Sequence, residues 1–155
     1  MENARNQFRS IYLIGAIATI IVLCGIVLDM IVGSIVTGGD ISSLPQTAID
    51  RFNQFKNNWI LGLYSLDLLN VIIQIITIPS IFAIYIAHKR IDNGYALLAL
   101  VLFLIGTTVF ISGNIALPMF ELSEKYFSVI SDAQKNLLAA AGESMLAKGA
   151  HGSLG

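Results

Sequence analysis

Three long apolar stretches constrain this chain more than any other feature of its sequence. They cover residues 11–37, 59–87 and 95–117, and none of them contains a lysine or an arginine. A helix of about 20 apolar residues crosses the roughly 30 Å of hydrocarbon in a bilayer. A single apolar stretch in lipid must be helical, because only a helix satisfies its own backbone hydrogen bonds there. The sequence therefore predicts an all-α integral membrane protein with three transmembrane helices.

The charge content of the whole chain agrees with this prediction. Charged residues make up 12% of the sequence and hydrophobic residues 55%, whereas a soluble domain has about 25% charged residues. The net charge is −1 and no basic stripe occurs, so a nucleic-acid partner is not expected. We expect the lipid bilayer to be the main partner.

Basic residues next to the apolar stretches predict the orientation. Arg5 and Arg9 precede the first stretch, and Lys89 and Arg90 occupy the short connection between the second and third. Because such residues accumulate on the cytoplasmic side of a membrane, the sequence predicts a cytoplasmic N-terminus. The first stretch is too long for a cleaved signal peptide, so we expect it to be retained.

The connection between the first two stretches has the pattern of a short amphipathic helix. Ser43 and Gln46 resemble a capping box, and Ile49, Phe52 and Phe55 recur every three residues. Polar residues fill the other face: Asp50, Arg51, Asn53 and Lys56. We expect this helix to lie on the membrane surface or on neighbouring helices. A lid over a substrate site is the alternative.

Residues 118–155 form a polar tail after the third stretch. Ser131 and Gln134 make a second capping box, which predicts a helix from Asp132 to about Ala147 with one face of small apolar residues. We expect three glycines to interrupt any continuation of this helix: Gly149, Gly152 and Gly155. The glycine-rich ending is open to two interpretations: the natural chain continues beyond this point, or the chain is ordered only to this point.

Two short motifs in the tail carry a resemblance. The segment SDAQKNLLAAAGESMLA contains Asp-Ala-Gln at residues 132–134 and Ala-Gly-Glu at residues 141–143, and residues 117–126 precede it. This pattern resembles a broad family of prokaryotic multi-helix integral membrane proteins that is defined only as a domain of unknown function. The resemblance extends to about residue 148 and implies a prokaryotic cell (inner) membrane, with further helices after the third. It implies no activity and no cofactor.

Two aspartates lie inside the apolar stretches. Asp29 stands about eight residues before the end of the first stretch, and Asp67 about eight residues after the start of the second. With a rise of 1.5 Å per residue, both carboxyls would lie roughly 12 Å below the same membrane surface. Gly25 and Gly33 share a helical face with Asp29, which predicts close approach of another helix. A carboxylate in hydrocarbon is costly and must be protonated, paired, hydrated or bound to a cation.

Further polar residues accompany these aspartates. In the second stretch they follow the spacing i, i+3, i+7 and i+10, which predicts one polar stripe: Asp67, Asn70, Gln74 and Thr77. The third stretch brings Thr108 and Ser112 to a similar depth. The candidate cation or proton site therefore comprises Asp29, Asp67, Asn70, Gln74, Thr108 and Ser112.

Three interpretations of these polar residues remain open. They can hold the helices together through hydrogen bonds, each contributing about 0.6 kcal/mol. The two carboxyls can instead share a proton or Na⁺, because two neighbouring carboxylates in a dry layer do not both ionise cheaply. In the third interpretation, a lysine or arginine from a partner subunit or a missing helix pairs with them.

No arrangement typical of an enzyme occurs in the stretches. The two histidines, His88 and His151, lie outside the apolar interiors, so neither haem nor a paired-histidine metal site is expected. Cys24 has no second cysteine to pair with, and we interpret it as an apolar packing residue. We therefore expect a non-enzymatic structural or accessory membrane component that joins other transmembrane helices, as a homo-oligomer or in a larger complex. A small transporter or ion-coupled sensor is the alternative.

Overall fold

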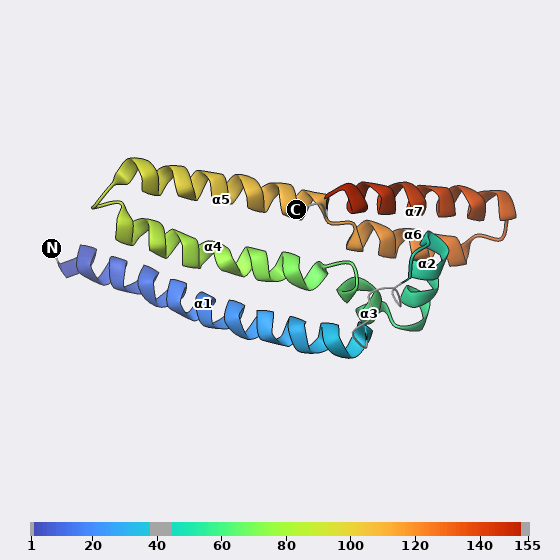
Figure 1. Cartoon of the computed structure of the whole chain (residues 1–155), viewed down its shortest axis with the longest axis horizontal. Helices are drawn as coiled ribbons and strands as arrows, with labels where there is room; N and C mark the ends of the chain where they lie inside the picture. Colours follow the sequence, from blue (N-terminus) through green and yellow to red (C-terminus); the bar gives the residue numbers. More distant parts are fainter. Residues whose placement is uncertain (1, 38–44, 153–155) are drawn as a thin grey trace. The chain divides into compact units, whose positions relative to one another are not determined.

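The chain folds as an all-α protein, as the sequence predicts. The computed structural model describes the backbone of residues 2–37 and 45–152 and the side chains of residues 9–36 and 45–148. In these ranges every regular element is an α-helix (Figure 1). The helices are α1 (Glu2–Thr37), α2 (Ala48–Asn57), α3 (Trp59–Tyr64), α4 (Leu68–His88), α5 (Asn93–Gly113), α6 (Ala116–Ser128) and α7 (Asp132–Gly152).

Three helical segments are long and apolar enough to cross a membrane. They are Arg9–Val36 in α1, Leu68–His88 in α4 and a segment within Asn93–Ser128 that includes α5. At most 22% of the apolar window in any of them is buried within the chain. A helix that stays apolar on its exposed faces is typical of a membrane span. The prediction of three membrane-length helices is confirmed.

The helices form two compact units. The first contains residues 1–34 and 70–111, and thus most of α1, α4 and α5. The second contains residues 35–69 and 112–155, with α2, α3, α6 and α7. The connection before α4 is thus grouped with the polar tail, and the boundary near residue 117 between a membrane region and a tail stays a prediction.

In the first unit, α4 lies between α1 and α5 (Figure 1). Small residues allow α1 to approach α4: a Cβ atom on Gly15 would collide with the Cβ of Ala83. A Cβ on Gly25 would lie 3.1 Å from the side chain of Ile73. Close approach at Gly25 agrees with the small-residue face predicted for the first stretch.

At the start of α5, Asp92 Oδ1 accepts hydrogen bonds from the amides of the two residues at positions 94 and 95.

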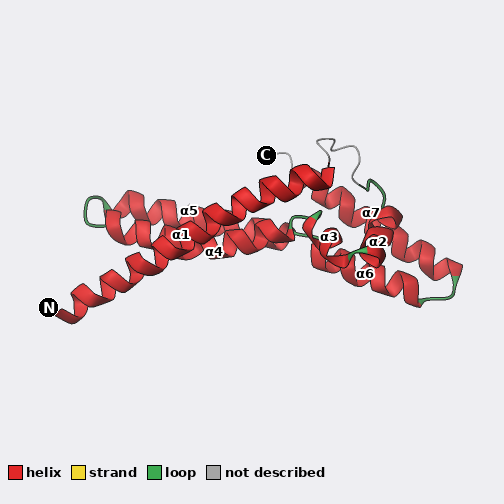
Figure 2. Ribbon diagram, turned by 90° about the horizontal axis from the view of Figure 1, so that it is seen from below, coloured by secondary structure: helices red, strands yellow, loops and turns green. Residues whose placement is uncertain are grey.

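In the second unit, α2 packs against α3, α6 and α7, and Figure 2 shows α6 and α7 side by side. Its core is formed by Ala48, Phe52, Phe55, Leu66, Ala116 and Met119. The Phe55 ring contacts the Phe120 ring edge-on, with centroids 5.5 Å apart. The Ser123 hydroxyl donates to the Phe52 carbonyl at 3.2 Å. The amphipathic helix predicted in the first connection thus lies on neighbouring helices.

Helix α7 approaches α2 at its Ala-Gly-Glu motif. A Cβ on Gly142 would lie 2.7 Å from the Cβ of Ala48 and 2.9 Å from Cζ of Phe52, so the absence of a side chain permits this contact. The Ala48 amide donates to Glu143 Oε1 at 2.7 Å. This carboxylate therefore satisfies an amide in the first turn of α2, where negative charge is also favoured by the helix dipole.

Helix α2 begins with a different N-cap residue from the one that the capping box predicts. Thr47 is the N-cap residue, and its hydroxyl accepts the Asp50 amide at 3.2 Å. Gln46 precedes the helix, and Ser43 lies outside the described residues. Because Thr47 and the distant Glu143 satisfy the first amides, α2 begins later than the local pattern predicts.

The buried face of α2 also differs from the prediction. Ile49 is 43% exposed, whereas Arg51, placed on the polar face, is only 9% exposed. A strict three-residue spacing drifts around a helix of 3.6 residues per turn, so it does not describe one face. The buried side of α2 follows the helical period instead, through Ala48, Phe52 and Phe55.

Helix α7 begins at Asp132, as predicted, but ends later than predicted. It continues through Gly149 to Gly152 rather than ending near Ala147. A glycine inside a helix costs only about 1 kcal/mol relative to alanine, so it does not have to end the helix.

The second and third apolar stretches are not single helices. Residues 65–67 form a turn between α3 and α4, and Asp67 has φ of 63°. Asp is one of the residues that tolerates this left-handed conformation. The third stretch is interrupted at residues 114–115 between α5 and α6. The prediction of continuous helices over residues 59–87 and 95–117 was therefore wrong.

A tertiary contact accounts for both interruptions. Asn114 Nδ2 donates to the Leu66 carbonyl at 2.9 Å, and Asn114 Oδ1 accepts the Ala116 amide at 3.0 Å. One side chain thus satisfies a carbonyl freed by the first interruption and an amide freed by the second. This contact compensates for helical hydrogen bonds that both segments lose.

Candidate functional site

The six residues of the predicted cation site are divided between the two units. Asp29, Asn70, Gln74 and Thr108 belong to the first unit, whereas Asp67 and Ser112 belong to the second. Asp29 lies in α1 and is partly buried, whereas Asp67 is exposed. A cation held jointly by the two aspartates stays a prediction.

Asp67 does not belong to the polar stripe of the second stretch. It occupies the turn before α4, whereas Asn70, Gln74 and Thr77 lie within that helix. The membrane-length part of this stretch begins at Leu68. The predicted stripe assumes one unbroken helix from Asp67 to Thr77. Asp67 lies instead in a left-handed turn before α4, so its side chain does not follow the helical spacing of Asn70, Gln74 and Thr77.

Gln74 connects α4 to α5. Its Nε2 donates to Thr107 Oγ1 at 2.8 Å, and Thr107 is 3% exposed. The depth of the third stretch predicts Thr108 instead, but the hydroxyl of Thr108 donates to the Leu104 carbonyl of its own helix at 2.9 Å. Successive residues of a helix point about 100° apart, and the apolar residues of α5 lie on all of its faces, so the sequence gives no signal of its rotation.

A second polar contact connects α1 to α4, and its residues are not among those predicted for the site. Thr19 Oγ1 lies 3.0 Å from Ser80 Oγ, and these hydroxyls lie 2.8 and 3.1 Å from the Gly15 carbonyl. The signal that was available is the four-residue spacing of Gly15 and Thr19, which places both on one helical face. The contact combines hydrogen bonding with the close approach that Gly15 permits.

We expect Gln74 and Thr107 to be energetically coupled by about 0.6 kcal/mol, the average for hydrogen bonds between membrane helices. The measurement is a double-mutant cycle with Gln74→Leu and Thr107→Val, read from equilibrium unfolding of the purified chain in mixed micelles. The matched control is Thr108→Val, which should show no coupling to Gln74→Leu. Equal coupling at both threonines would contradict the assigned contact.

Arg51 forms a polar cluster with residues near the turn before α4. Its Nη1 donates to Ser65 Oγ at 2.9 Å, and the Ser65 hydroxyl lies 2.9 Å from Gln54 Oε1. Burial lowers the pKa of the Arg51 guanidinium, while the negative charge of nearby Asp67 acts in the opposite direction. Arginine nevertheless stays charged in proteins.

This cluster brings a cation close to one of the two aspartates. Asp67 was expected to meet a lysine or arginine only in a partner subunit or a missing helix, but Arg51 of the chain's own α2 lies near it. Within the described part of the chain, the buried Nε of Arg51 has no hydrogen-bond partner. The cluster therefore combines a buried positive charge with an exposed carboxylate at a left-handed turn.

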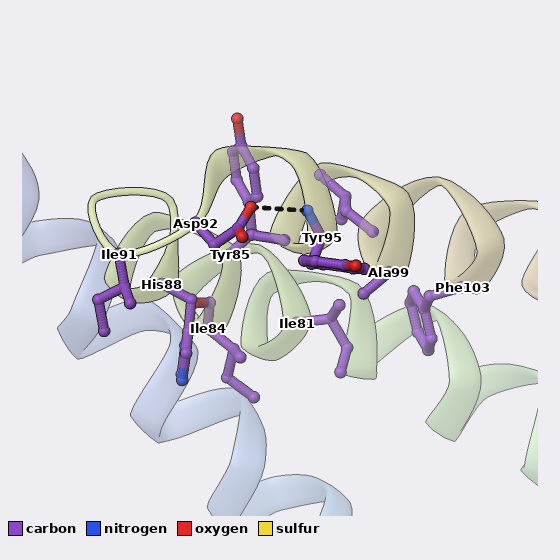
Figure 3. Close-up of a pocket in the computed structure, with 11 residues that line it drawn as sticks. Ile81, Ile84, Tyr85, His88, Ile91, Asp92, Tyr95, Ala99 and Phe103 are labelled. Atoms are coloured by element: carbon purple, nitrogen blue, oxygen red, sulfur yellow. Dashed lines mark hydrogen bonds between the residues drawn. The ribbon is translucent and has the colours of Figure 1, made fainter.

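A groove between α4 and α5 is the third feature of interest (Figure 3). It has a volume of about 430 Å³ and is mainly apolar. Its lining residues are Ile81, Ile84, Tyr85, His88, Ile91, Asp92, Tyr95, Ala96, Ala99, Leu100 and Phe103. Its polar members gather at the end next to the turn of residues 89–92, as the labelled side chains in Figure 3 show.

The polar groups at this end of the groove have identified contacts. Asp92 accepts the Tyr95 amide at 3.2 Å, as Figure 3 marks. The Tyr85 hydroxyl donates to Asn93 Oδ1 at 3.4 Å, and His88 Nδ1 donates to the Ile84 carbonyl at 3.0 Å. A mostly apolar concavity of this volume, with a few polar groups, is typical of a small-molecule site.

Neither metal-binding groups nor similarity to known proteins assigns a role to these features. Across residues 9–36 and 45–148, no group of three or more His, Cys, Asp or Glu side chains is placed to hold a metal ion. Comparisons with protein-family models, curated proteins and solved structures find no match for the chain. The resemblance carried by residues 132–134 and 141–143 stays a prediction.

Proposed function

We propose that this chain is a structural or accessory component of a prokaryotic cell membrane, with its N-terminus in the cytoplasm. The observation that carries the proposal is the use of polar side chains in contacts between membrane-length helices. Gln74 donates to Thr107, and Thr19 lies at hydrogen-bond distance from Ser80. Side chains used in this way stabilise helix packing in lipid, which is the first of the three interpretations.

The proposal includes association with further transmembrane helices. Large apolar side chains remain exposed on all three membrane-length segments, for example Leu23, Ile84 and Leu102. These faces suit either lipid or another helix. Light scattering of the purified full chain in detergent tests this part: self-association requires a protein mass that is a multiple of 16.8 kDa. A monomer that copurifies with no other protein would contradict association.

The alternative is an ion-coupled transporter or sensor. One observation favours it: Asp29 lies within the Arg9–Val36 segment, where a carboxyl is costly. A bound ion stabilises the folded state, by about 2.7 kcal/mol when its concentration is 100 times its Kd. A structural role instead predicts the same thermal midpoint for the full chain in sodium and choline salts. Protection by Na⁺ that disappears in Asp29→Asn would replace the proposed function with the alternative.

The variant Asp67→Asn is expected to behave differently from Asp29→Asn. It removes the negative charge near the buried Arg51 and should lower the free energy of unfolding by about 1 kcal/mol, because Asp67 is exposed and solvent screens the interaction. The loss should be equal in sodium and choline salts. The measurement is chemical unfolding followed by the fluorescence of Trp59, the one tryptophan of the sequence. A loss seen only in sodium would show instead that Asp67 acts through an ion.

A further inference from the structure

We propose that the groove between α4 and α5 holds one acyl chain of an anionic phospholipid, whose phosphate meets the basic turn of residues 89–92. The groove is lined by side chains from both helices, with Ile81 and Phe103 far from this turn and His88 and Ile91 next to it. This inference goes beyond the proposed function: it requires only that these helices lie in a membrane, whatever the chain assembles with.

The length of the groove fits one leaflet of a bilayer. Its lining residues extend from His88 to Ile81 along α4 and from Tyr95 to Phe103 along α5. At 1.5 Å per residue these distances are about 10 and 12 Å. One leaflet contributes about half of the roughly 30 Å hydrocarbon thickness. The groove starts at the end of α4 next to His88, and its length covers most of the depth of one leaflet.

The distribution of polarity along the groove fits one phospholipid molecule. Its lining is mainly apolar along α4 and α5, and its polar members gather at the end next to the turn of residues 89–92 (Figure 3). A phospholipid has the same division, with an apolar acyl chain and a polar headgroup at one end.

The residues at the mouth fit an anionic headgroup. Lys89 and Arg90 occupy the turn between His88 and Ile91, and Lys89 Nζ lies 5.8 Å from the centre of the Tyr85 ring that lines the groove. Tyrosines mark the interface level of a membrane protein, and basic residues beside them attract anionic lipids. One acidic residue, Asp92, also lies at this end of the groove. Its carboxylate accepts hydrogen bonds from two backbone amides at the start of α5, and the positive end of the helix dipole there offsets its negative charge.

The test is native mass spectrometry of the full chain in detergent with equal amounts of palmitoyl-oleoyl phosphatidylglycerol and phosphatidylcholine. We expect phosphatidylglycerol to bind about 25-fold better, since each of two basic residues near the phosphate contributes a factor of about five. The double variant Lys89→Gln/Arg90→Gln should lose this preference and still bind both lipids. The matched control Lys125→Gln/Lys135→Gln should retain it.

A second variant tests the acyl-chain site. Ala99→Trp places a large ring in the groove and should reduce binding of both lipids at least tenfold. Ala16→Trp, at an exposed alanine of α1, is the matched control and should bind lipid like the wild type. Circular dichroism verifies that both variants are folded.

Three outcomes would overturn the proposal. The first is undiminished phosphatidylglycerol binding by Ala99→Trp. The second is displacement of the lipid by millimolar inorganic phosphate, which would indicate a phosphate site without an acyl-chain site. The third is a wild-type dimer that Ala99→Trp converts to a monomer without loss of lipid, which would assign the groove to a second copy. None of these outcomes depends on whether the chain serves a structural role.

Discussion

Replacing Gly142 with leucine is expected to lower the free energy of unfolding of the second unit by about 3 kcal/mol. Even a Cβ at this position would lie 2.7 Å from the Cβ of Ala48 and 2.9 Å from the ring of the fully buried Phe52. The Cβ of Ala48 is fixed to the backbone, so α7 must move away from α2. That movement also breaks the 2.7 Å hydrogen bond from the Ala48 amide to Glu143.

Chemical unfolding of the full chain, followed by the fluorescence of Trp59, measures this effect. Trp59 belongs to the second unit, and its ring lies 6.5 Å from that of Phe120, so its fluorescence reports on this unit. The control is Gly106→Leu in α5, where an added Cβ has nothing within 4 Å. A Gly142→Leu midpoint equal to that of the wild type would contradict the packing of α7 on α2.

Alanine substitutions at the same two positions should change stability in opposite directions. Gly106→Ala gains helix propensity, up to about 1 kcal/mol, and meets no neighbouring atom. Gly142→Ala gains the same propensity but must displace Ala48 or Phe52, so we expect a net loss of about 1 kcal/mol. Stabilisation by both substitutions would contradict the close approach of α7 to α2 at Gly142, because it would show that a Cβ fits there.

Replacing Gly15 with leucine is expected to separate α1 from α4. Its Cβ would collide with the Cβ of Ala83 and lie 3.2 Å from the Pro79 carbonyl oxygen. Neither atom moves with a side-chain rotation, so the backbones must part, at a cost of about 2–3 kcal/mol. The hydrogen bonds among Thr19, Ser80 and the Gly15 carbonyl are lost at the same time.

Disulfide cross-linking in membranes measures this separation. The variant Thr19→Cys/Ser80→Cys, in a Cys24→Ser background, places two thiols where the hydroxyl oxygens are 3.0 Å apart. We expect rapid oxidation with Gly15 and a rate at least tenfold lower with Gly15→Leu, because 1.4 kcal/mol corresponds to a factor of ten. Gly106→Leu should leave the rate unchanged. Equal rates in all three backgrounds would show that Gly15 does not control the approach of α1 to α4.

The helical class and the membrane-length segments could be predicted because they depend on local composition. A long run of apolar residues without lysine or arginine is unfavourable in water and favours lipid. No water reaches the backbone there, so the segment forms a helix, which satisfies its own N–H and C=O groups. The start of α7 at Asp132 could be predicted for a similar reason, because a capping residue acts within one turn of the helix it begins. These signals lie within a few residues of the structure they determine.

The candidate site could be predicted only in part. The polar character of Gln74 was recognised, but its partner is Thr107 rather than Thr108, since the rotation of α5 is set by packing. Arg51 was assigned to an exposed face, yet it is buried next to Ser65. A charged residue gives no sequence signal of burial when the group that pairs with it lies more than ten residues away.

Composition alone sets the surroundings that each segment requires: lipid for the apolar stretches, and a packed or aqueous environment for the polar connections. The positions of the breaks in the apolar stretches, and the pairing of their polar groups, depend instead on contacts between residues that are far apart in the sequence. Asn114 stabilises the turn at Leu66 from 48 positions along the chain, and this turn places Asp67 outside the membrane-length helix. The physical reason is that a backbone hydrogen bond lost at a break must be replaced, and the replacing group is brought there by folding.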